Sequence, residues 1–292
     1  MIELKKAYPD DIGRIIPLLY DEFGLEKMSG RRLERQKESF RKLFGIHWNS
    51  KQDHIGYILE EDKKISGFIA YIFSERMILD KIYKFCNMSA WAVRKGSRSS
   101  ALSLTMPVKE LIEEGYTITN LSPSPSAYDV FRKLHGFRDL ETHYILIPYI
   151  PSVSRRSSVS VSINEEVELS GVSDFVRKNY EDSAPYGAQM LHIRTSSDSC
   201  SVIFKKTYYK RYIPASGILF VSDPEVFIKN IQLLRSVINR KSGTAVMITD
   251  SRFINGKNIN FSYVKKMHNP KLFWSERFEK DRIDNLYSEN LL

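Results

Sequence analysis

The sequence predicts an α/β fold, and three observations support the prediction. Strand-like and helix-like segments alternate from the N-terminus to Ile147, as expected when helices pack on a sheet. A segment rich in proline and serine follows, and the second half then shows a similar order of elements. The length of 292 residues, of which 42% are hydrophobic, allows two units with a core in each.

The first elements are a short strand and two helices. Met1 to Lys6 has a strand pattern, and Pro9-Asp10-Asp11 begins a helix with an acidic N-terminal end. A second, basic helix is predicted from Arg31 to about Leu43, with Ser29 as its N-cap. The buried stripe of the first helix is indicated by apolar residues at helical spacing: Ile12, Ile15, Ile16, Leu18 and Leu19.

A β-hairpin and a long strand follow. The hairpin consists of Ile55–Glu60 and Ile65–Ile72, joined by a charged tip. Lys81–Val93 is the long strand, and it leads into the basic turn Arg94–Arg98, which is rich in small residues. A helix is predicted from Ser99 to about Glu114.

This strand–turn–helix segment can hold a pyrophosphate. The first N–H groups of a helix have no intrahelical partner, and the helix dipole is positive there. Arg98 adds a forked donor with a permanent charge. An ordinary strand–turn–helix without a ligand is the alternative. Pro107 lies inside the predicted helix and should kink or divide it, because proline removes a backbone hydrogen bond.

The first half closes with a strand, a helix and a strand. Thr117–Leu121 is the first strand, Ala127–Leu134 the helix, and Arg138–Ile147 the second strand. The turn Ser122-Pro123-Ser124-Pro125-Ser126 is rigid and can cap the helix.

Three of these segments resemble motifs of the GNAT superfamily of N-acetyltransferases. Arg98-Ser99-Ser100-Ala101-Leu102-Ser103 resembles the acyl-CoA motif Arg/Gln-x-x-Gly-x-Gly/Ala, with Ala101 and Ser103 at the two small positions and no glycine. The hairpin sequence Y-I-L-E-E-D-K-K-I-S-G-F-I-A resembles the second and third strands of the family. The sequence S-P-S-A-Y-D-V-F-R-K-L-H-G-F-R resembles its last motif. The chain is also similar to uncharacterised bacterial acyltransferase-like proteins.

The resemblance implies a mixed, mostly antiparallel sheet flanked by helices, in two GNAT-like units. It implies acetyl-CoA, or another acyl-CoA, as the cosubstrate, no metal, and an amine of a small metabolite or amino sugar as acceptor. The pantetheine arm would pair like an added strand with the backbone of Trp91, Ala92 and Val93. The pyrophosphate would lie at Arg98, Ser99, Ser100, Ala101, Leu102 and Ser103.

The resemblance also suggests how protons are handled. GNAT enzymes often use a tyrosine of the last motif to protonate the departing thiolate, and the nearest positions here are Phe131 and Arg132. Tyr128 lies about one turn earlier, so we expect it to be the catalytic donor, with an ordinary helix tyrosine as the alternative. Lys81–Val93 contains no carboxylate, so we expect water relayed through backbone and hydroxyl groups to act as the base.

The predicted organisation is a GNAT-like domain at 1–149, a linker at 150–164 and a second, degenerate GNAT-like domain at 165–292. No phosphate-binding motif follows Val221, and the tail Asp281–Leu292 is expected to dock on a neighbouring domain. The predicted elements of the second half are a helix at Val172–Asn179, strands at Ser201–Tyr208 and Gly217–Val221, a helix at Pro224–Asn239 and a strand at Thr244–Thr249.

Composition restricts the compartment and the partners. The net charge of +9 suits a polyanion such as coenzyme A or nucleic acid, and a solvated basic surface explains it equally well. The two cysteines match no metal or redox spacing. Neither a signal peptide nor an apolar run of about 18 residues is found, so a cytoplasmic protein without a membrane segment is predicted.

Three functions therefore compete. The first is an acyl-CoA-dependent N-acyltransferase, and the second is a GNAT fold that binds acyl-CoA without catalysis. In the third, which we do not expect, the protein associates with nucleic acid through basic and aromatic residues of the second half: Lys205, Lys206, Tyr208, Tyr209, Lys210, Arg211, Tyr212 and Phe220. The oligomeric state is not predicted.

Overall fold

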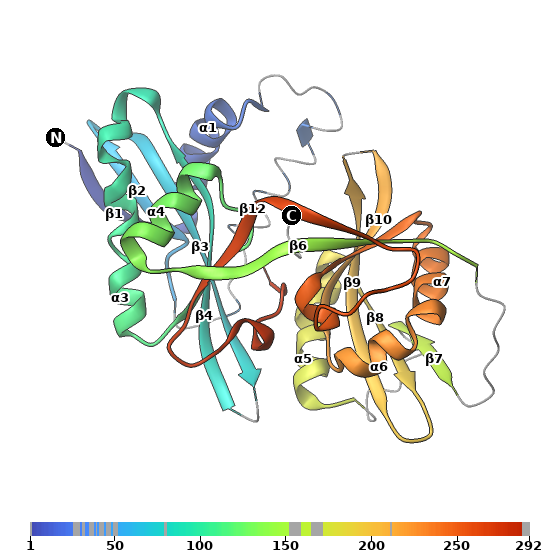
Figure 1. The fold of residues 1–292 in the computed structure, drawn as a ribbon. Coiled ribbons are helices and arrows are strands. Elements are labelled where there is room, and N and C mark those ends of the chain that lie inside the picture. Colours follow the sequence, from blue (N-terminus) through green and yellow to red (C-terminus); the bar gives the residue numbers. More distant parts are fainter. Residues whose placement is uncertain are drawn as a thin grey trace. The chain divides into compact units, whose positions relative to one another are not determined.

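The computed structural model describes residues 2–25, 30, 33, 34, 38, 40, 44, 48, 52–78, 81–151, 159–164, 172–210 and 212–287. These residues form two compact units, each of which can be followed in Figure 1. Unit 1 holds Met1–Arg138 and Lys271–Phe278, and unit 2 holds Asp139–Pro270 and the segment that begins at Glu279. Most of the predicted helix Arg31–Leu43 lies outside the described residues.

The described part of unit 1 contains a mixed sheet with the strand order β1-β2-β3-β4-β5-β12. Neighbouring strands are antiparallel except β4 and β5, which are parallel. The predicted mixed, mostly antiparallel sheet is thus confirmed. The strands are β1 (Glu3–Ala7), β2 (Gly56–Glu61), β3 (Lys64–Ile78), β4 (Lys81–Val93), β5 (Thr117–Asn120) and the end of β12 (Tyr263–Trp274).

The helices of unit 1 begin and end at residues that suit those positions. Helix α4 is N-capped by Ser124, whose Oγ accepts a hydrogen bond from the Ala127 N–H over 3.2 Å, and it ends at Gly136 with a φ of 68°. Pro107 is the N-cap of α3, so the proline divides the predicted helix as expected. The described helices are η1 (Pro9–Asp11), α1 (Ile12–Glu22), η3 (Lys95–Thr105), α3 (Val108–Glu113) and α4 (Pro125–His135).

Alternation along β3 assigns the two faces of the sheet in unit 1. Ile69 and Phe73 pack in one core with residues of η3, α3 and α4, including Leu104. Phe68 points to the opposite face, where the ring of Phe44 meets it edge-on at 5.3 Å. The sheet of unit 1 therefore carries apolar packing on both faces.

The described part of unit 2 repeats this arrangement with the strand order β6-β11-β10-β9-β8-β7. Its parallel pair is β10 and β11, and the pairs β11–β6, β10–β9, β8–β9 and β7–β8 are antiparallel. Its elements are β6 (Arg138–Pro148), β7 (Ser160–Ile163), α5 (Asp174–Ser183), β8 (Ala188–Arg194), β9 (Ser199–Tyr209), β10 (Ile213–Val221), α6 (Pro224–Lys229), α7 (Ile231–Ser242) and β11 (Val246–Asp250).

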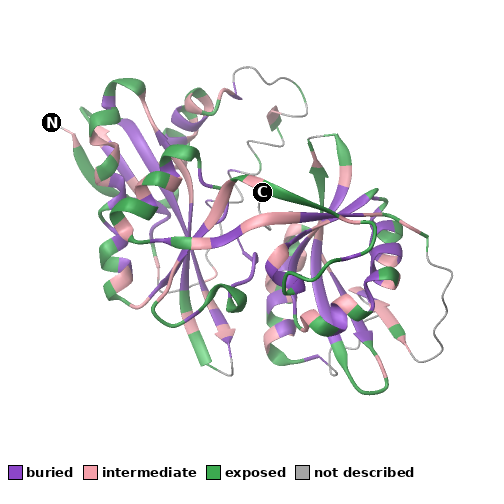
Figure 2. Cartoon of the chain, viewed as in Figure 1, coloured by how far each residue is buried: buried purple, intermediate pink, exposed green. Residues whose placement is uncertain are grey.

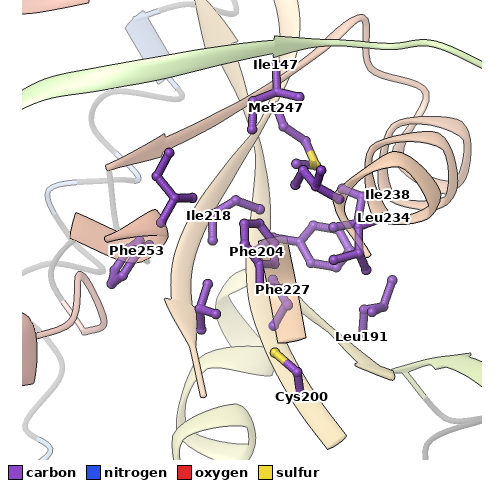
Figure 3. Close-up of a cluster of buried hydrophobic side chains, with 14 of the residues drawn as sticks. Ile147, Leu191, Cys200, Phe204, Ile218, Phe227, Leu234, Ile238, Met247 and Phe253 are labelled. Carbon is purple, nitrogen blue, oxygen red and sulfur yellow. The ribbon is translucent and has the colours of Figure 1, made fainter. Parts of the chain in front are cut away.

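The core of unit 2 lies between its sheet and the helices α6 and α7 (Figure 3). Phe204 and Met247 from the strands and Phe227 and Leu234 from the helices are each fully buried. Buried residues run along the central strands of each unit, and exposed ones lie on the outer sides of helices, in connections, and on edge or terminal parts of strands such as β1 and the start of β12 (Figure 2). Each unit therefore has a core of its own.

The last strand of each unit is contributed by the other half of the sequence. β6 follows α4 directly in the chain, yet it pairs with β11 in unit 2. The end of β12 pairs with β5 in unit 1 through Leu272, Phe273 and Trp274. This division differs from the predicted boundary at residue 149, and β7 lies within the predicted linker 150–164.

Several elements of unit 2 differ from prediction. The predicted helix Pro224–Asn239 is two helices that meet at Asn230. The strands β8 and β12 were not predicted. No helix among the described residues is long and apolar enough to cross a membrane.

Candidate functional site

The parallel strands β4 and β5 of unit 1 separate part of the way along β4. They pair over three residues, and the last pair is Asn87 with Thr119. At this branch point the Thr119 hydroxyl donates a hydrogen bond to Asn87 Oδ1 over 2.9 Å. β5 ends at Asn120 while β4 runs on to Val93. After Asn87, no described strand pairs with β4 on the side of β5. The backbone of this part of β4 can therefore pair with an added chain.

β4 contains a β-bulge beside this gap. Phe68 of β3 pairs with Ala92, whereas Ala70 pairs with Ser89, so β4 has one residue more than β3 between these pairs. Ala90 has a φ of 48°, in the left-handed region that alanine rarely adopts. A bulge leaves one residue unpaired and locally disrupts the ladder.

Two adjacent cavities follow β4 past the bulge, an outer one of about 570 Å³ and an inner one of about 330 Å³. The outer cavity is lined by Glu22, Phe23, Trp91, Ala92, Val93, Arg98, Ala101, Leu102, Ser124, Ser126 and Val130. The inner cavity is lined by Phe23, Leu25, Phe40, Ile69, Met88, Ser89, Ala90, Trp91, Asn120, Ser122, Pro123, Ser124 and Ala127. Phe23, Trp91 and Ser124 line both.

The structure brings most of the predicted coenzyme-binding residues to the outer cavity. Its lining includes six of the nine, namely Trp91, Ala92, Val93, Arg98, Ala101 and Leu102. Ser99, Ser100 and Ser103 lie on η3 but are not part of this lining. Trp91 lines both cavities, and its indole N–H is buried and has no hydrogen-bond partner among the described residues.

The helix after the basic turn differs from prediction. Residues Lys95–Thr105 form a 3₁₀ helix and the α-helix begins only at Val108. Pro107 explains the break, because its ring prevents one continuous α-helix through this region. The backbone N–H groups at the start of a 3₁₀ helix also lack intrahelical partners, so the change leaves donors beside the outer cavity.

The charge at the outer cavity comes mainly from arginines. Arg98 is exposed, and its Nη2 lies 4.0 Å from a carboxylate oxygen of Glu22. Arg94, at the start of the turn, donates from Nη1 to Asp21 Oδ2 over 2.9 Å. A ligand with phosphate groups could take the place of these weak surface ion pairs.

The inner cavity reaches both faces of the sheet through the gap. Ile69 and Met88 belong to the core under η3, α3 and α4. Phe40 instead stacks on Phe44 at 5.9 Å, and Phe44 covers Phe68 on the opposite face. Two reactants could therefore meet at the gap from opposite faces.

Tyr128 lies on α4 and lines neither of the two cavities. Its ring packs against the core of unit 1, and its hydroxyl accepts a hydrogen bond from Arg132 Nη1 over 2.6 Å. Phe131 is fully buried and contacts the Trp91 ring at 5.7 Å between centroids. The motif position where the family often has a tyrosine is thus a packing residue beside the outer cavity.

Burial determines the protonation of three groups near the gap. Burial raises the pKa of the Tyr71 hydroxyl and that of the Cys86 thiol well above their ordinary values, so both stay protonated at neutral pH. Burial lowers the pKa of His135, which favours its neutral form. His135 Nε2 lies 3.0 Å from Thr105 Oγ1 and so connects α4 with η3, the two elements that flank the outer cavity.

Sequence reasoning missed the apolar residues that line the inner cavity. Phe23 and Leu25 lie between the two predicted N-terminal helices and Phe40 lies in the second, and none of the three was given a role at the site. Asn120 ends β5 at the gap and was not identified either. Only the three-dimensional pairing of β4 with β5 reveals these positions, because they come from segments far apart in the sequence.

No protein-family model matches the sequence, and no curated protein matches it. Solved structures do match. A GCN5-related N-acetyltransferase from Anabaena variabilis is 13% identical with a TM-score of 0.57, covering 94% of this chain and 72% of that one. An Enterococcus faecalis protein described as a probable N-acyltransferase is 14% identical with a TM-score of 0.56, at the same coverage. Saccharomyces cerevisiae N-myristoyltransferase with bound myristoyl-CoA is 9% identical with a TM-score of 0.50, covering 97% and 82%.

These likenesses cover almost the whole chain at low sequence identity. They show that this protein has the fold of the GCN5-related N-acetyltransferases, as the sequence motifs suggest.

Proposed function

We propose that the protein is an acyl-CoA-dependent N-acyltransferase whose coenzyme site lies in unit 1. The observation that carries this proposal is the gap between β4 and β5, with a bulge at Ala90 and a basic turn at its end. The fold's solved relatives include acetyltransferases and a myristoyl-CoA complex, which supports a CoA thioester as donor. Acetyl-CoA is the smallest donor proposed, and the acceptor is the amine of a small metabolite or amino sugar.

The residues present fit a CoA thioester. The pantetheine arm would lie in the outer cavity and pair with the backbone of Trp91, Ala92 and Val93 like an added strand. The Trp91 side chain would form one wall along the arm. The pyrophosphate would lie at the start of η3 beside Arg98, where the small side chains of Ser99, Ser100, Ala101 and Ser103 leave the backbone accessible.

A bound thioester supplies an activated carbonyl carbon. The amine nitrogen forms a bond to that carbon while the carbon–sulfur bond breaks, the nitrogen loses a proton to water, and the sulfur gains one. Backbone N–H groups at the bulge would stabilise the negative charge that develops on the carbonyl oxygen. Tyr128 is the proposed proton donor to sulfur; its hydroxyl accepts from Arg132 Nη1 and lines neither cavity, so this role requires the side chain to turn toward the thioester.

A titration of the full-length protein with coenzyme A in a calorimeter tests the site. Ala101→Phe should abolish binding, because a ring at this position of the outer cavity would fill space that the phosphates need. Ala184→Phe is the matched control, since Ala184 is also half-buried but lies in unit 2. Unchanged affinity of the Ala101→Phe protein would place the coenzyme site elsewhere.

One observation favours a second candidate, an acyl-CoA-binding protein without catalysis. Phe131 occupies a position where the family often has its tyrosine, and its ring is buried against Trp91. The two candidates differ in a simple assay: release of CoA thiol from acetyl-CoA that depends on an added amine. A panel of amines that includes amino sugars is tested. If none of them accelerates thiol release while CoA still binds, the binding protein is favoured.

A further inference from the structure

The floor of the inner cavity is apolar and lies on a single face of the sheet. Ile69, Met88 and Ala127 line this floor, and each is at most 3% exposed. All three belong to the core under η3, α3 and α4, and η3 and α4 also flank the outer cavity. A ligand that follows β4 from the outer cavity past the bulge at Ala90 therefore meets this floor.

The inner cavity is larger than an acetyl group requires. Its volume of about 330 Å³ equals roughly ten waters at about 30 Å³ each. An acetyl group places a single methyl beyond its carbonyl carbon, so most of the volume would remain for water. The cavity is also lined by Ser89, Asn120, Ser122 and Ser124. Water against the apolar floor gains few hydrogen bonds, whereas methylene groups gain from leaving water there.

We propose that the inner cavity holds the acyl chain of the donor, and that the protein prefers medium-length, straight acyl groups to acetyl. This inference rests on the proposed function, because it requires the coenzyme arm in the outer cavity. Met88 is the specificity-determining residue of the proposal, since it lines the floor and is 2% exposed.

The position of the floor favours the acyl chain over the acceptor as its occupant. The floor and the side of the outer cavity formed by η3 and α4 share one face of the sheet, so a chain attached to the thioester continues directly onto Ile69 and Met88. The side of the cavity at Phe40 belongs to the opposite face. An acceptor entering from that side reaches the thioester without displacing the acyl chain.

The test measures binding without an acceptor, so it does not depend on knowing the amine. Coenzyme A and its acetyl, butanoyl, hexanoyl and octanoyl thioesters are titrated into the full-length protein by calorimetry. Each added methylene that becomes buried should tighten binding by up to about fourfold. We expect hexanoyl-CoA to bind between about tenfold and about 10²-fold more tightly than acetyl-CoA.

A variant at the floor sharpens the test. Met88→Ala lengthens the cavity and should shift the tightest binding from hexanoyl-CoA to octanoyl-CoA. Met190→Ala is the matched control, because Met190 is fully buried in unit 2 and should leave the chain-length order unchanged. Thermal unfolding of both variants checks that they fold. If Met88→Ala does not fold, the titrations of the wild-type protein with the series of thioesters decide the question.

The outcomes separate this inference from the function on which it rests. If acetyl-CoA and hexanoyl-CoA bind with affinities less than tenfold apart, the acyl-chain proposal is overturned while the coenzyme site stands. If neither coenzyme A nor any thioester binds, the proposed function fails and this inference fails with it. A tenfold or greater gain for hexanoyl-CoA supports both.

Discussion

Units 1 and 2 each contain a gap between the two parallel strands of their sheet, but the two gaps differ in their surroundings. In each, a parallel pair of strands separates after three paired residues, β4 from β5 and β10 from β11. In each, the longer strand then contains a bulge. In β10, Ile218 pairs with Phe204 but Phe220 pairs with Ile203, so Leu219 is the extra residue. The strand layout alone therefore does not make a coenzyme site.

In unit 2 the chain's own C-terminal segment occupies the gap. The Asn285 N–H donates to the carbonyl oxygen of Leu219 over 3.0 Å, at the bulge itself. The Asn285 side chain accepts from Arg252 Nη2 over 2.7 Å and donates to Asp250 Oδ2 over 2.8 Å. Residues 283–287 are all buried. The tail thus takes in unit 2 the position that the coenzyme arm takes in our proposal for unit 1.

The turns that follow the two bulged strands carry opposite charges. In unit 1 the turn after β4 contains Arg94, Lys95 and Arg98. In unit 2 the turn after β10 contains Asp223, whose Oδ1 accepts from the Val226 N–H over 2.9 Å, and then Glu225. Carboxylates at that position repel phosphate groups, so unit 2 lacks the basic turn that follows β4 in unit 1, and its gap is filled by the tail.

The largest effect is expected from breaking the buried contacts of the tail. Asp250→Ala removes the carboxylate that pairs with Arg252 at 3.0 Å, and both side chains are almost fully buried. Arg252 would then remain buried without that carboxylate, so we expect a loss of about 3–5 kcal/mol in the free energy of unfolding. Urea denaturation measures it.

Asp21→Ala is the control for this prediction. Asp21 pairs with Arg94 in unit 1 at a similar distance, 2.9 Å, but about half of each side chain is exposed. Its loss should cost at most about 1 kcal/mol. Equal losses for the two variants would show that the tail of unit 2 is not held by a buried ion pair.

Local signals made most of the fold predictable. The stripe of Ile15, Leu18 and Leu19 indicated α1, and all three residues are fully buried. The expected break at Pro107 and the helix start at Ser124 are both observed. β12 was missed because its first part is lysine-rich, exposed and contains Pro270, so it lacks the alternation that marks a strand.

Which strands pair could not be read from local signals. The exchange of β6 and β12 between the units depends on contacts between residues more than a hundred positions apart, such as Phe273 with Thr119. The site shows the same limit. The basic turn and Trp91 were predicted from their motif, whereas the inner cavity depends on Phe40, Ile69 and Met88 meeting at the gap.

The second-largest expected effect is a loss of turnover at the proposed site in unit 1. Tyr128→Phe should lower turnover by about 10²-fold, the lower end for a general acid, and leave CoA affinity nearly unchanged. The measurement is the initial rate of thiol release with an amine acceptor. A fall of less than about threefold would leave Tyr128 as a packing residue and favour protonation of the thiolate by water.

Tyr287→Phe provides the comparison in unit 2. The Tyr287 hydroxyl is buried and donates toward Asn179 Oδ1 at 3.2 Å and Asp182 Oδ2 at 3.1 Å. Its removal should cost about 1 kcal/mol in stability and leave turnover unchanged. If both variants lowered turnover equally, loss of stability would explain the effect of Tyr128→Phe.

The smallest effect should appear in the pH dependence of the two units. Burial lowers the pKa of His135 in unit 1 and of His192 in unit 2 below the ordinary value of 6.5. Below pH 6.5 the unfolded chain therefore binds more protons at these positions than the folded chain does. The stability that each neutral histidine contributes is complete above pH 6.5 and is lost as the pH falls toward the lowered pKa.

Only His135 should couple this titration to coenzyme binding. Its contact with Thr105 joins α4 to η3 beside the outer cavity, whereas His192 contacts Ser201 Oγ at 2.8 Å within unit 2. Binding of coenzyme A should weaken by about two- to threefold between about pH 7.5 and about pH 5.5, and His135→Gln should weaken that dependence. The phosphates of the coenzyme titrate equally in every variant, so His192→Gln should keep the wild-type profile. Calorimetry at the two pH values measures the affinity of all three proteins for coenzyme A. The same pH dependence in all three would show that His135 is not coupled to coenzyme binding.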